Sequence, residues 1–153
     1  MSNRIIIADT TCLIALSRIA RLEILKTLFS EIHISSEIKN EFGEETPEWI
    51  IVKNPKRYDM VELISYNLDL GEATAISLAI ENPNSLLIID EKKGRKVAKD
   101  LGLNVIGLLG ILIKAKERKV INSVSVLLNE LEAAEFRISQ KLRLQILKLV
   151  NEN

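Results

Sequence analysis

The chain has 153 residues, of which 47% are hydrophobic and 27% charged, and this ordinary globular composition excludes a disordered or low-complexity protein. Its 21 basic and 21 acidic residues balance, and aromatic residues at 4% are too few for a platform on which nucleic-acid bases stack. The single cysteine, Cys12, excludes an intrachain disulfide and a multi-cysteine zinc site, and no apolar run is long enough to span a membrane.

We therefore expect one cytoplasmic domain over residues 1–153. In its first half, aliphatic strands alternate with helices, because short aliphatic runs are separated by stretches with apolar residues at helical spacing. Ser35 or Ser36 is placed to cap the helix that runs to Phe42, and Gly43 follows the end of that helix. The expected elements are a strand at 5–9, a helix over 13–29, a strand at 32–35, a helix from Ser35 or Ser36 to Phe42, a strand at 49–52 and a helix over about 57–67.

The second half of the chain continues the same alternation and closes with helices. Asp69 is placed to cap the helix in "DLGEATAISLAIEN", and Gly102 ends the helix in "KKGRKVAKDLG". After the helix that begins at Asp69, we expect a strand at 85–90, the helix that ends at Gly102, a strand at 104–107, a helix over 108–118 and two C-terminal helices within about 122–150.

The strands indicate the fold class. They are aliphatic without polar alternation, and a helix separates each from the next, which is typical of a parallel sheet covered on both faces. We predict a three-layer α/β/α sandwich with a central, mainly parallel sheet. Ligands bind such sheets at the carboxyl ends of the strands. Asp9 and Asp90 both stand at that end.

The position of Asp9 is costly unless something compensates its charge, because an unpaired buried carboxylate loses its hydration. Two further acids are expected near Asp9 and Asp90: Glu41 at the edge of an apolar helix face, and Glu72 in a first helical turn. Four converging carboxylates raise each other's pKa unless a divalent cation is present. Mg²⁺ favours oxygen ligands, and the chemistry that follows is metal-assisted hydrolysis of a phosphodiester.

Each acid alone also has a purely structural interpretation. Asp9 and Asp90 are also suited to turns or caps, and Glu72 stabilises a helix N-terminus without any further role. Glu41 is one of several glutamates in this part of the sequence that are candidates for the same role. Only the joint pattern indicates a site, where the hydroxyls of Thr10 and Thr11 are placed to bond the Asp9 carboxylate or a phosphate.

A basic segment follows the last of these acids. Nine basic residues against two acids lie between Lys92 and Lys119, which gives that segment a charge of +7. Solvated helix faces account for such a cluster equally well. If the segment binds RNA, we expect Lys92, Lys93 and Arg95 to contact phosphates, which is salt-sensitive and carries no sequence information.

Five segments together resemble the PIN domain, and more closely its prokaryotic branch related to VapC-type toxins. The strand that ends in Asp9 is moderately specific, whereas "GEATAI" followed by "IIDEKKGR" is a strong signal. The resemblance runs from Ile5 to about Ser139. The segments are, in order, "IIIADTTCLIALSRIARLEILKTLF", "IKNEF", "GEATAISLA", "IIDEKKGRKVAKDLGL" and "VIGLLGILIKAKERKVI".

The resemblance implies a metal-dependent ribonuclease that binds Mg²⁺ or Mn²⁺. It assigns the metal-binding acids to Asp9, Glu41, Glu72 and Asp90, with Glu91 as an auxiliary acid. Toxin members often have aspartate where this chain has Glu72, which reaches about one methylene further. Many relatives are paired with a small antitoxin protein and form homodimers, and the resemblance implies both partners as expectations.

The leading hypothesis is therefore a metal-dependent endoribonuclease that acts on RNA, the toxin of a toxin–antitoxin pair. One alternative is a catalytically weak or inactive module of the same fold that binds nucleic acid or protein. Another is a phosphoryl-transfer domain that forms an aspartyl phosphate at Asp9. The "DTT" run opposes that last alternative, because it lacks a second aspartate two positions after Asp9.

Overall fold

The computed structural model describes residues 4–153, and these form five strands and nine helices. The strands are β1 (Ile6–Ala8), β2 (Ile32–Ile34), β3 (Ile50–Val52), β4 (Leu86–Ile88) and β5 (Asn104–Ile106). The helices are α1 (Thr10–Arg18), α2 (Glu23–Phe29), α3 (Ser36–Phe42), α4 (Tyr58–Ile64), α5 (Leu70–Glu81), α6 (Lys92–Asp100), α7 (Leu108–Glu117), α8 (Val124–Ala133) and α9 (Gln140–Leu149). In this part of the chain, no helix is long and apolar enough to cross a membrane.

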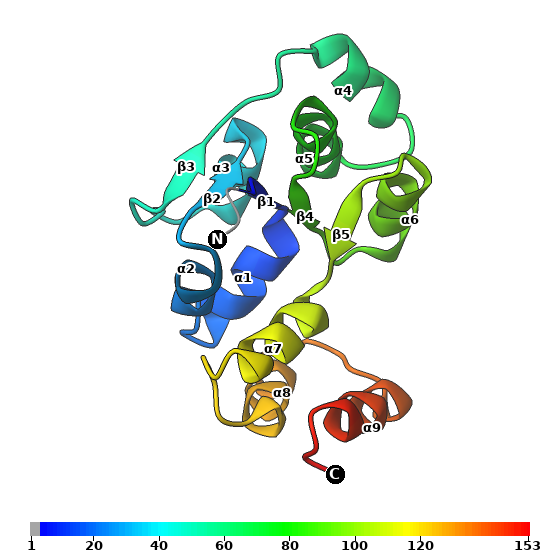
Figure 1. Cartoon of the computed structure of the whole chain (residues 1–153). Coiled ribbons are helices and arrows are strands. Elements are labelled where there is room, and N and C mark those ends of the chain that lie inside the picture. The colour runs from blue at the N-terminus through cyan, green and yellow to red at the C-terminus, as the bar shows by residue number, and fades with distance from the viewer. Residues whose placement is uncertain (1–3) are drawn as a thin grey trace.

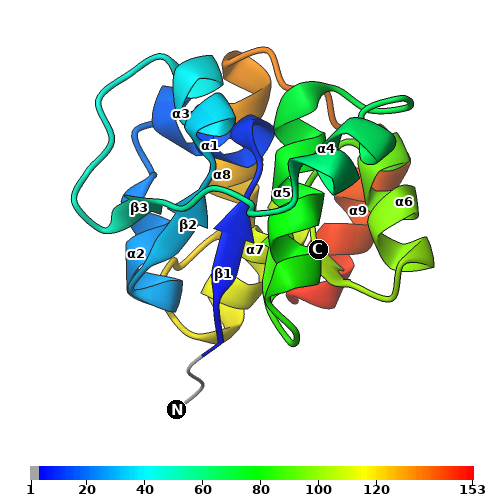
Figure 2. The same ribbon diagram turned by 90° about the horizontal axis from the view of Figure 1, so that it is seen from above.

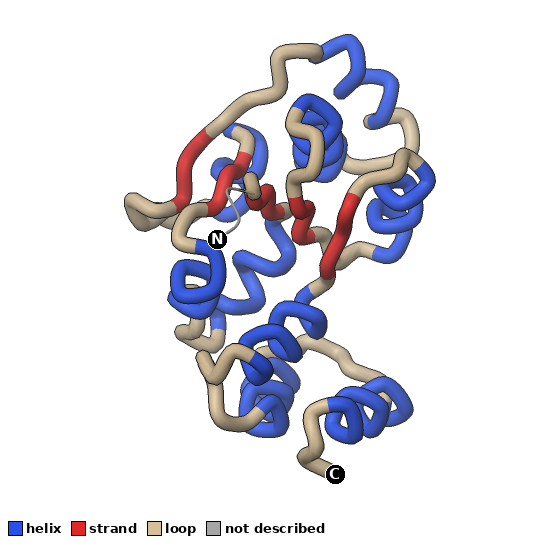
Figure 3. Tube along the Cα trace, in the orientation of Figure 1, coloured by secondary structure: helices blue, strands red, loops and turns tan. Residues whose placement is uncertain are grey.

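The sheet is parallel throughout, and its strands lie in the order β3-β2-β1-β4-β5 (Figure 3). At its centre, Ile7 of β1 is in register with His33 of β2 and Leu87 of β4. All residues of β1 and β4 are buried, as expected for aliphatic strands covered on both faces. The predicted α/β class with a parallel sheet is confirmed.

Helices cover both sides of the sheet (Figure 1). Helix α5 packs against β1 and β4 on one side, with α4 beside it, and α1, α2 and α7 lie on the other. The small residues of α5, including Ala75 and Ala79, permit its close approach and are buried. Helices α8 and α9 lie beyond α7, farthest from the sheet. This is the predicted three-layer arrangement.

The single helix predicted over 13–29 is wrong, because the chain turns between α1 and α2. Ala20 adopts a positive φ of 58°, and Arg21 donates its backbone N–H to the carbonyl of Leu16 at 2.8 Å. Both helices bury their leucines on the same side of the sheet, so the apolar spacing continues through the turn and hides it.

The two C-terminal helices are present and shorter than predicted. The Glu152 carboxylate joins the chain end to α8 by accepting the backbone N–H groups of Val124 and Ser125 at 2.7 and 3.0 Å. It also pairs with Lys116 at 2.9 Å. Burial acts to raise the pKa of Glu152, but these bonds outweigh it and hold that pKa at about 2. The end of the chain is thus fastened to the first turn of α8.

Candidate functional site

The carboxyl ends of β1 and β4 deliver two acids to one edge of the sheet. Asp9 follows β1 and precedes α1, and Asp90 follows β4 closely. The backbone N–H of Asp9 donates to the carbonyl of Ile88 at 2.9 Å, which fixes the two strand ends together. In Figure 2 this end of β1 lies toward α3, opposite the N-terminus. The prediction that both strands bring an acid to the same edge is confirmed.

Asp9 is a buried carboxylate without a strong partner. Only 4% of the residue is exposed, and its side chain makes no capping hydrogen bond to α1. Burial, with the negative charges of Asp69, Glu41 and Glu91 adding to it and the backbone amide of Thr10 opposing it, raises the pKa of Asp9 to about 7. In the absence of a cation, the ionised form of Asp9 therefore opposes folding near neutral pH.

Glu72 is also buried, and its side chain turns back to the start of α5. Its backbone N–H donates to Asp69 Oδ1 at 2.8 Å, and its Oε1 accepts the Asp69 N–H at 3.3 Å, which together form a capping box. Burial, together with the negative charges of Asp69 and Asp9, raises the pKa of Glu72 to about 7. Glu72 therefore caps α5 and also lies near Asp9, so its role in the helix does not exclude a role in binding a metal.

Asp69 is a site neighbour that the sequence identified only as a cap. Its charge raises the pKa of both Asp9 and Glu72. The sequence placed Asp69 as a helix cap, but its proximity to Asp9, 60 residues earlier, depends on how α5 packs against β1.

Glu41 reaches the same edge from α3. Its Oε1 accepts a hydrogen bond from the Thr10 hydroxyl at 2.6 Å, which connects α3 to α1. The Thr10 hydroxyl therefore donates to Glu41 and not to Asp9, and its contact with a phosphate stays a prediction. Thr11 is half-buried, and its hydroxyl makes no hydrogen bond within residues 4–153.

Asp90 flanks the cluster on the side of α7. Its Oδ1 accepts the backbone N–H of Leu108 at 3.0 Å. The buried Cys12 lies close enough to both strand-end acids that Asp90 and then Asp9 add to the effect of burial in raising its thiol pKa. Cys12 is thus a core residue and no nucleophile. Glu91 caps α6 by accepting the Lys93 N–H at 3.1 Å.

The basic residues of α6 begin beside Asp90. Lys92 and Lys93 are exposed, whereas Arg95 is half-buried. The Arg95 Nε is buried without a hydrogen-bond partner in the described chain, and both its guanidinium and Asp90 Oδ1 lie against Gly107. The positively charged Arg95 guanidinium therefore lies near Asp90, and its Nε–H is a hydrogen-bond donor that no group of the described chain uses.

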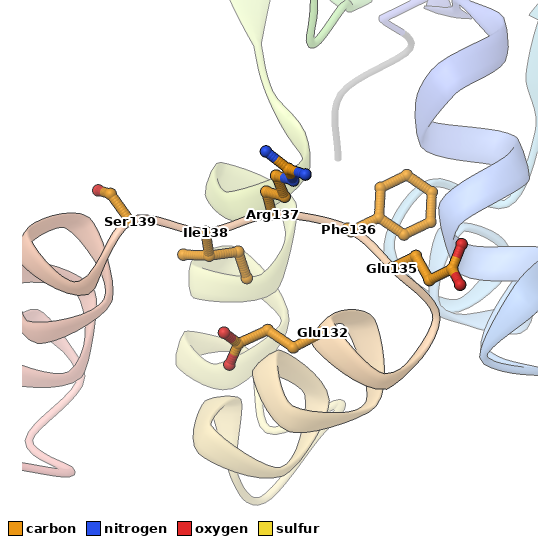
Figure 4. A pocket seen from close by; sticks show the side chains of 6 residues that line it. All are labelled: Glu132, Glu135, Phe136, Arg137, Ile138 and Ser139. Carbon is orange, nitrogen blue, oxygen red and sulfur yellow. The ribbon is translucent and has the colours of Figure 1, made fainter.

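Two cavities lie near the C-terminal helices. One, of about 580 Å³, runs from Asp90 and Arg95 between α7 and α9 and is lined mostly by aliphatic side chains such as Leu142. The other, of about 790 Å³, surrounds the loop between α8 and α9 (Figure 4). The predicted acids do not line this second cavity, so the first is the one connected to the site.

The donor set fits a hard divalent cation. No ion pair formed within residues 4–153 neutralises Asp9, Glu41, Glu72 or Asp90. In the same residues, no three acidic, histidine or cysteine side chains are grouped closely enough to enclose an ion by themselves. Mg²⁺ usually takes one or two carboxylates directly and keeps several waters. A buried, uncompensated Asp9 with further acids around it matches that requirement.

Comparisons with known proteins bear on the whole chain. A family model described as a PIN domain matches residues 5–152, a range that includes every acid of the cluster. None of the curated proteins matches the chain at a significant level.

Proposed function

The chain belongs to the PIN domain family, and from this premise we propose that it is a Mg²⁺- or Mn²⁺-dependent endoribonuclease. PIN domains are generally nucleases. The observation that carries the proposal is Asp9, a 4% exposed carboxylate with a pKa of about 7 at the carboxyl end of a central strand. Such a group costs folding free energy near neutral pH and is retained where its charge is used.

The acids and hydroxyls divide the work of the site in this proposal. Asp9, Glu41, Glu72 and Asp90 hold the cation, directly or through its waters. When bound, Mg²⁺ or Mn²⁺ lowers the pKa of a water and offsets the charge that develops on phosphoryl oxygens. Thr10 fixes the Glu41 carboxylate by its 2.6 Å hydrogen bond. The free hydroxyl of Thr11 is available to the substrate, and Glu91 contributes negative charge at the rim.

RNA is proposed as the substrate, and a cleavage assay tests this directly. Purified protein is incubated with RNA and single-stranded DNA of one sequence in Mn²⁺, Mg²⁺ or a chelator. We expect cleavage of RNA in either metal and none in chelator. Faster cleavage of DNA would contradict the proposed substrate, and equal cleavage in chelator would contradict the proposed cofactor.

The exposed lysines of α6 are proposed to bind phosphates. Replacing Lys92 and Lys93 with Ala is expected to raise KM for RNA with little change in kcat, because phosphate contacts made equally in ground and transition states affect binding alone. For every phosphate that the protein no longer neutralises, the slope of log K against log salt should fall by roughly 0.7 for a single strand. Lys26→Ala on the exposed face of α2 is the matched control. A fall in kcat with unchanged KM would contradict this role.

A toxin role with an antitoxin partner is the finer part of the proposal. The cavity of about 580 Å³ that reaches Asp90 and Arg95 offers an aliphatic wall to a segment of a small inhibitory protein. If RNA cleavage is toxic, expression of the wild-type chain in bacteria should arrest growth and expression of Asp9→Asn should not. Growth arrest by both forms would contradict a toxin that acts by cleavage.

A further inference from the structure

Gly71 and Glu41 are in direct contact across two helices. Gly71 is the second residue of α5, and Glu41 is near the end of α3. A Cβ atom at Gly71 would lie 2.9 Å from Glu41 Cδ and 3.1 Å from Oε2, and it would overlap Oε1. The Glu41 carboxylate thus occupies the space that a side chain at position 71 would take, while its Oε1 accepts the Thr10 hydroxyl.

The backbone does not require glycine at this position. Gly71 lies in regular helix without a positive φ, in contrast to Gly43 and Gly102 at φ of 74° and 78°. Alanine stabilises a helix more than glycine does, so helix propensity favours a side chain here. Only the neighbouring carboxylate gives a reason for its absence.

We propose that Gly71 is a positioning residue: because it has no side chain, it leaves room for the Glu41 carboxylate between α5 and Thr10, at the edge of the sheet where Asp9 lies. The inference rests on the proposed function, because the effect of this positioning is to keep Glu41 where it can bind the cation. Gly94 differs, because a Cβ there would first meet the apolar Ile89 Cδ1 at 2.8 Å and then Glu72 Oε2 at 3.1 Å. Only at Gly71 are all of the nearest atoms those of a carboxylate from the site.

The test is a four-way comparison of wild type, Gly71→Ala, Glu41→Asp and the double variant. The new methyl group is expected to push the Glu41 carboxylate away from Thr10, which lowers Mn²⁺ affinity and RNA cleavage by roughly 10- to 100-fold, as loss of groups that orient metal ligands does. The thermal midpoint should stay the same or rise. Glu41→Asp shortens the side chain, so it should reduce activity in the wild type but restore part of it beside the methyl group.

A glycine with a different neighbour is the control. At Gly110 in α7, a Cβ would lie 2.7 Å from Ile106 Cγ1, an apolar contact, so Gly110→Ala should lower stability and leave Mn²⁺ affinity unchanged. Wild-type Mn²⁺ affinity in Gly71→Ala, or equal losses from Gly71→Ala with either residue at position 41, would overturn the inference.

Failure of the proposed function is recognised separately. If the wild type neither binds Mn²⁺ nor cleaves RNA, the nuclease proposal is overturned and the positioning role is tested by the crystal structure of Gly71→Ala. A Glu41 carboxylate that still bonds Thr10 in that variant would overturn the positioning role, and a displaced one would support it.

Discussion

Asp9→Asn is expected to abolish metal-dependent RNA cleavage. Loss of a group that only orients a metal ligand typically costs roughly 10- to 100-fold, and Asp9 is proposed as a ligand itself, so the loss should exceed about 100-fold. The measurement is the cleavage rate at saturating RNA with Mn²⁺ in excess. Asp100→Asn, at an exposed site paired with Lys96 on α6, is the control and should cleave like the wild type. Retained cleavage in Asp9→Asn would contradict the proposed role.

The same substitution should stabilise the metal-free protein at pH 8. Because the pKa of Asp9 rises from 3.8 to about 7 on folding, the folded state holds its proton more tightly. The free energy of unfolding of the wild type therefore falls by at most about 4 kcal/mol as the pH rises from about 4 to 7, and it stays low at higher pH. Asn carries no charge, so the free energy of unfolding of Asp9→Asn in chelator should exceed that of the wild type at pH 8 and match it near pH 4.

Urea unfolding of both forms at the two pH values checks this expectation. Asp59→Asn is the control, since Asp59 is exposed and its hydrogen bond with Arg57 lowers its pKa, the opposite direction to Asp9. It should bring no gain in stability at pH 8. An Asp9→Asn variant less stable than the wild type at pH 8 would mean that the ionised carboxylate has a stabilising partner after all.

Mn²⁺ is expected to stabilise the wild type at pH 8 and much less at pH 5. A ligand that binds only the folded state at 100 times its Kd adds about 2.7 kcal/mol to the free energy of unfolding. Binding requires deprotonated carboxylates. Because Asp9 and Glu72 both have pKa values of about 7, they are largely protonated at pH 5 and ionised at pH 8.

Thermal unfolding with and without Mn²⁺ at the two pH values is the measurement, with Asp9→Asn in parallel. The variant should gain little from Mn²⁺ at either pH. Equal gains in wild type and variant, or a gain at pH 5 as large as that at pH 8, would indicate binding elsewhere on the protein.

The sequence was sufficient for the fold class because its strands are aliphatic runs that need cover on both faces. The rest of the fold depends on contacts between distant segments. The turn at Ala20 breaks a continuous apolar stripe without interrupting its spacing, so pattern alone does not locate it. The strand order likewise follows from pairing between segments far apart in the chain, such as β1 with β4.

The site was predictable where an acid ends a strand, as at Asp9 and Asp90, because parallel strands share one carboxyl edge. It was less predictable where helices bring the groups. The hydrogen bond from Thr10 to Glu41 joins residues 31 apart and depends on how α1 meets α3. Gly71 gave no signal of its role in the sequence, since a glycine before Glu72 is equally compatible with an ordinary helix start.

In the proposed function, Asp9 and the acids around it hold a divalent cation that the protein uses to cleave RNA. The most direct measurement is a titration of Mn²⁺ into metal-free protein at pH 8, with bound metal and RNA cleavage followed in the same sample. We predict that binding and cleavage rise together with one midpoint, and that both are lost in Asp9→Asn. Binding without cleavage, or cleavage that precedes binding, would contradict the claim and favour a PIN-type module that binds nucleic acid or protein without catalysis.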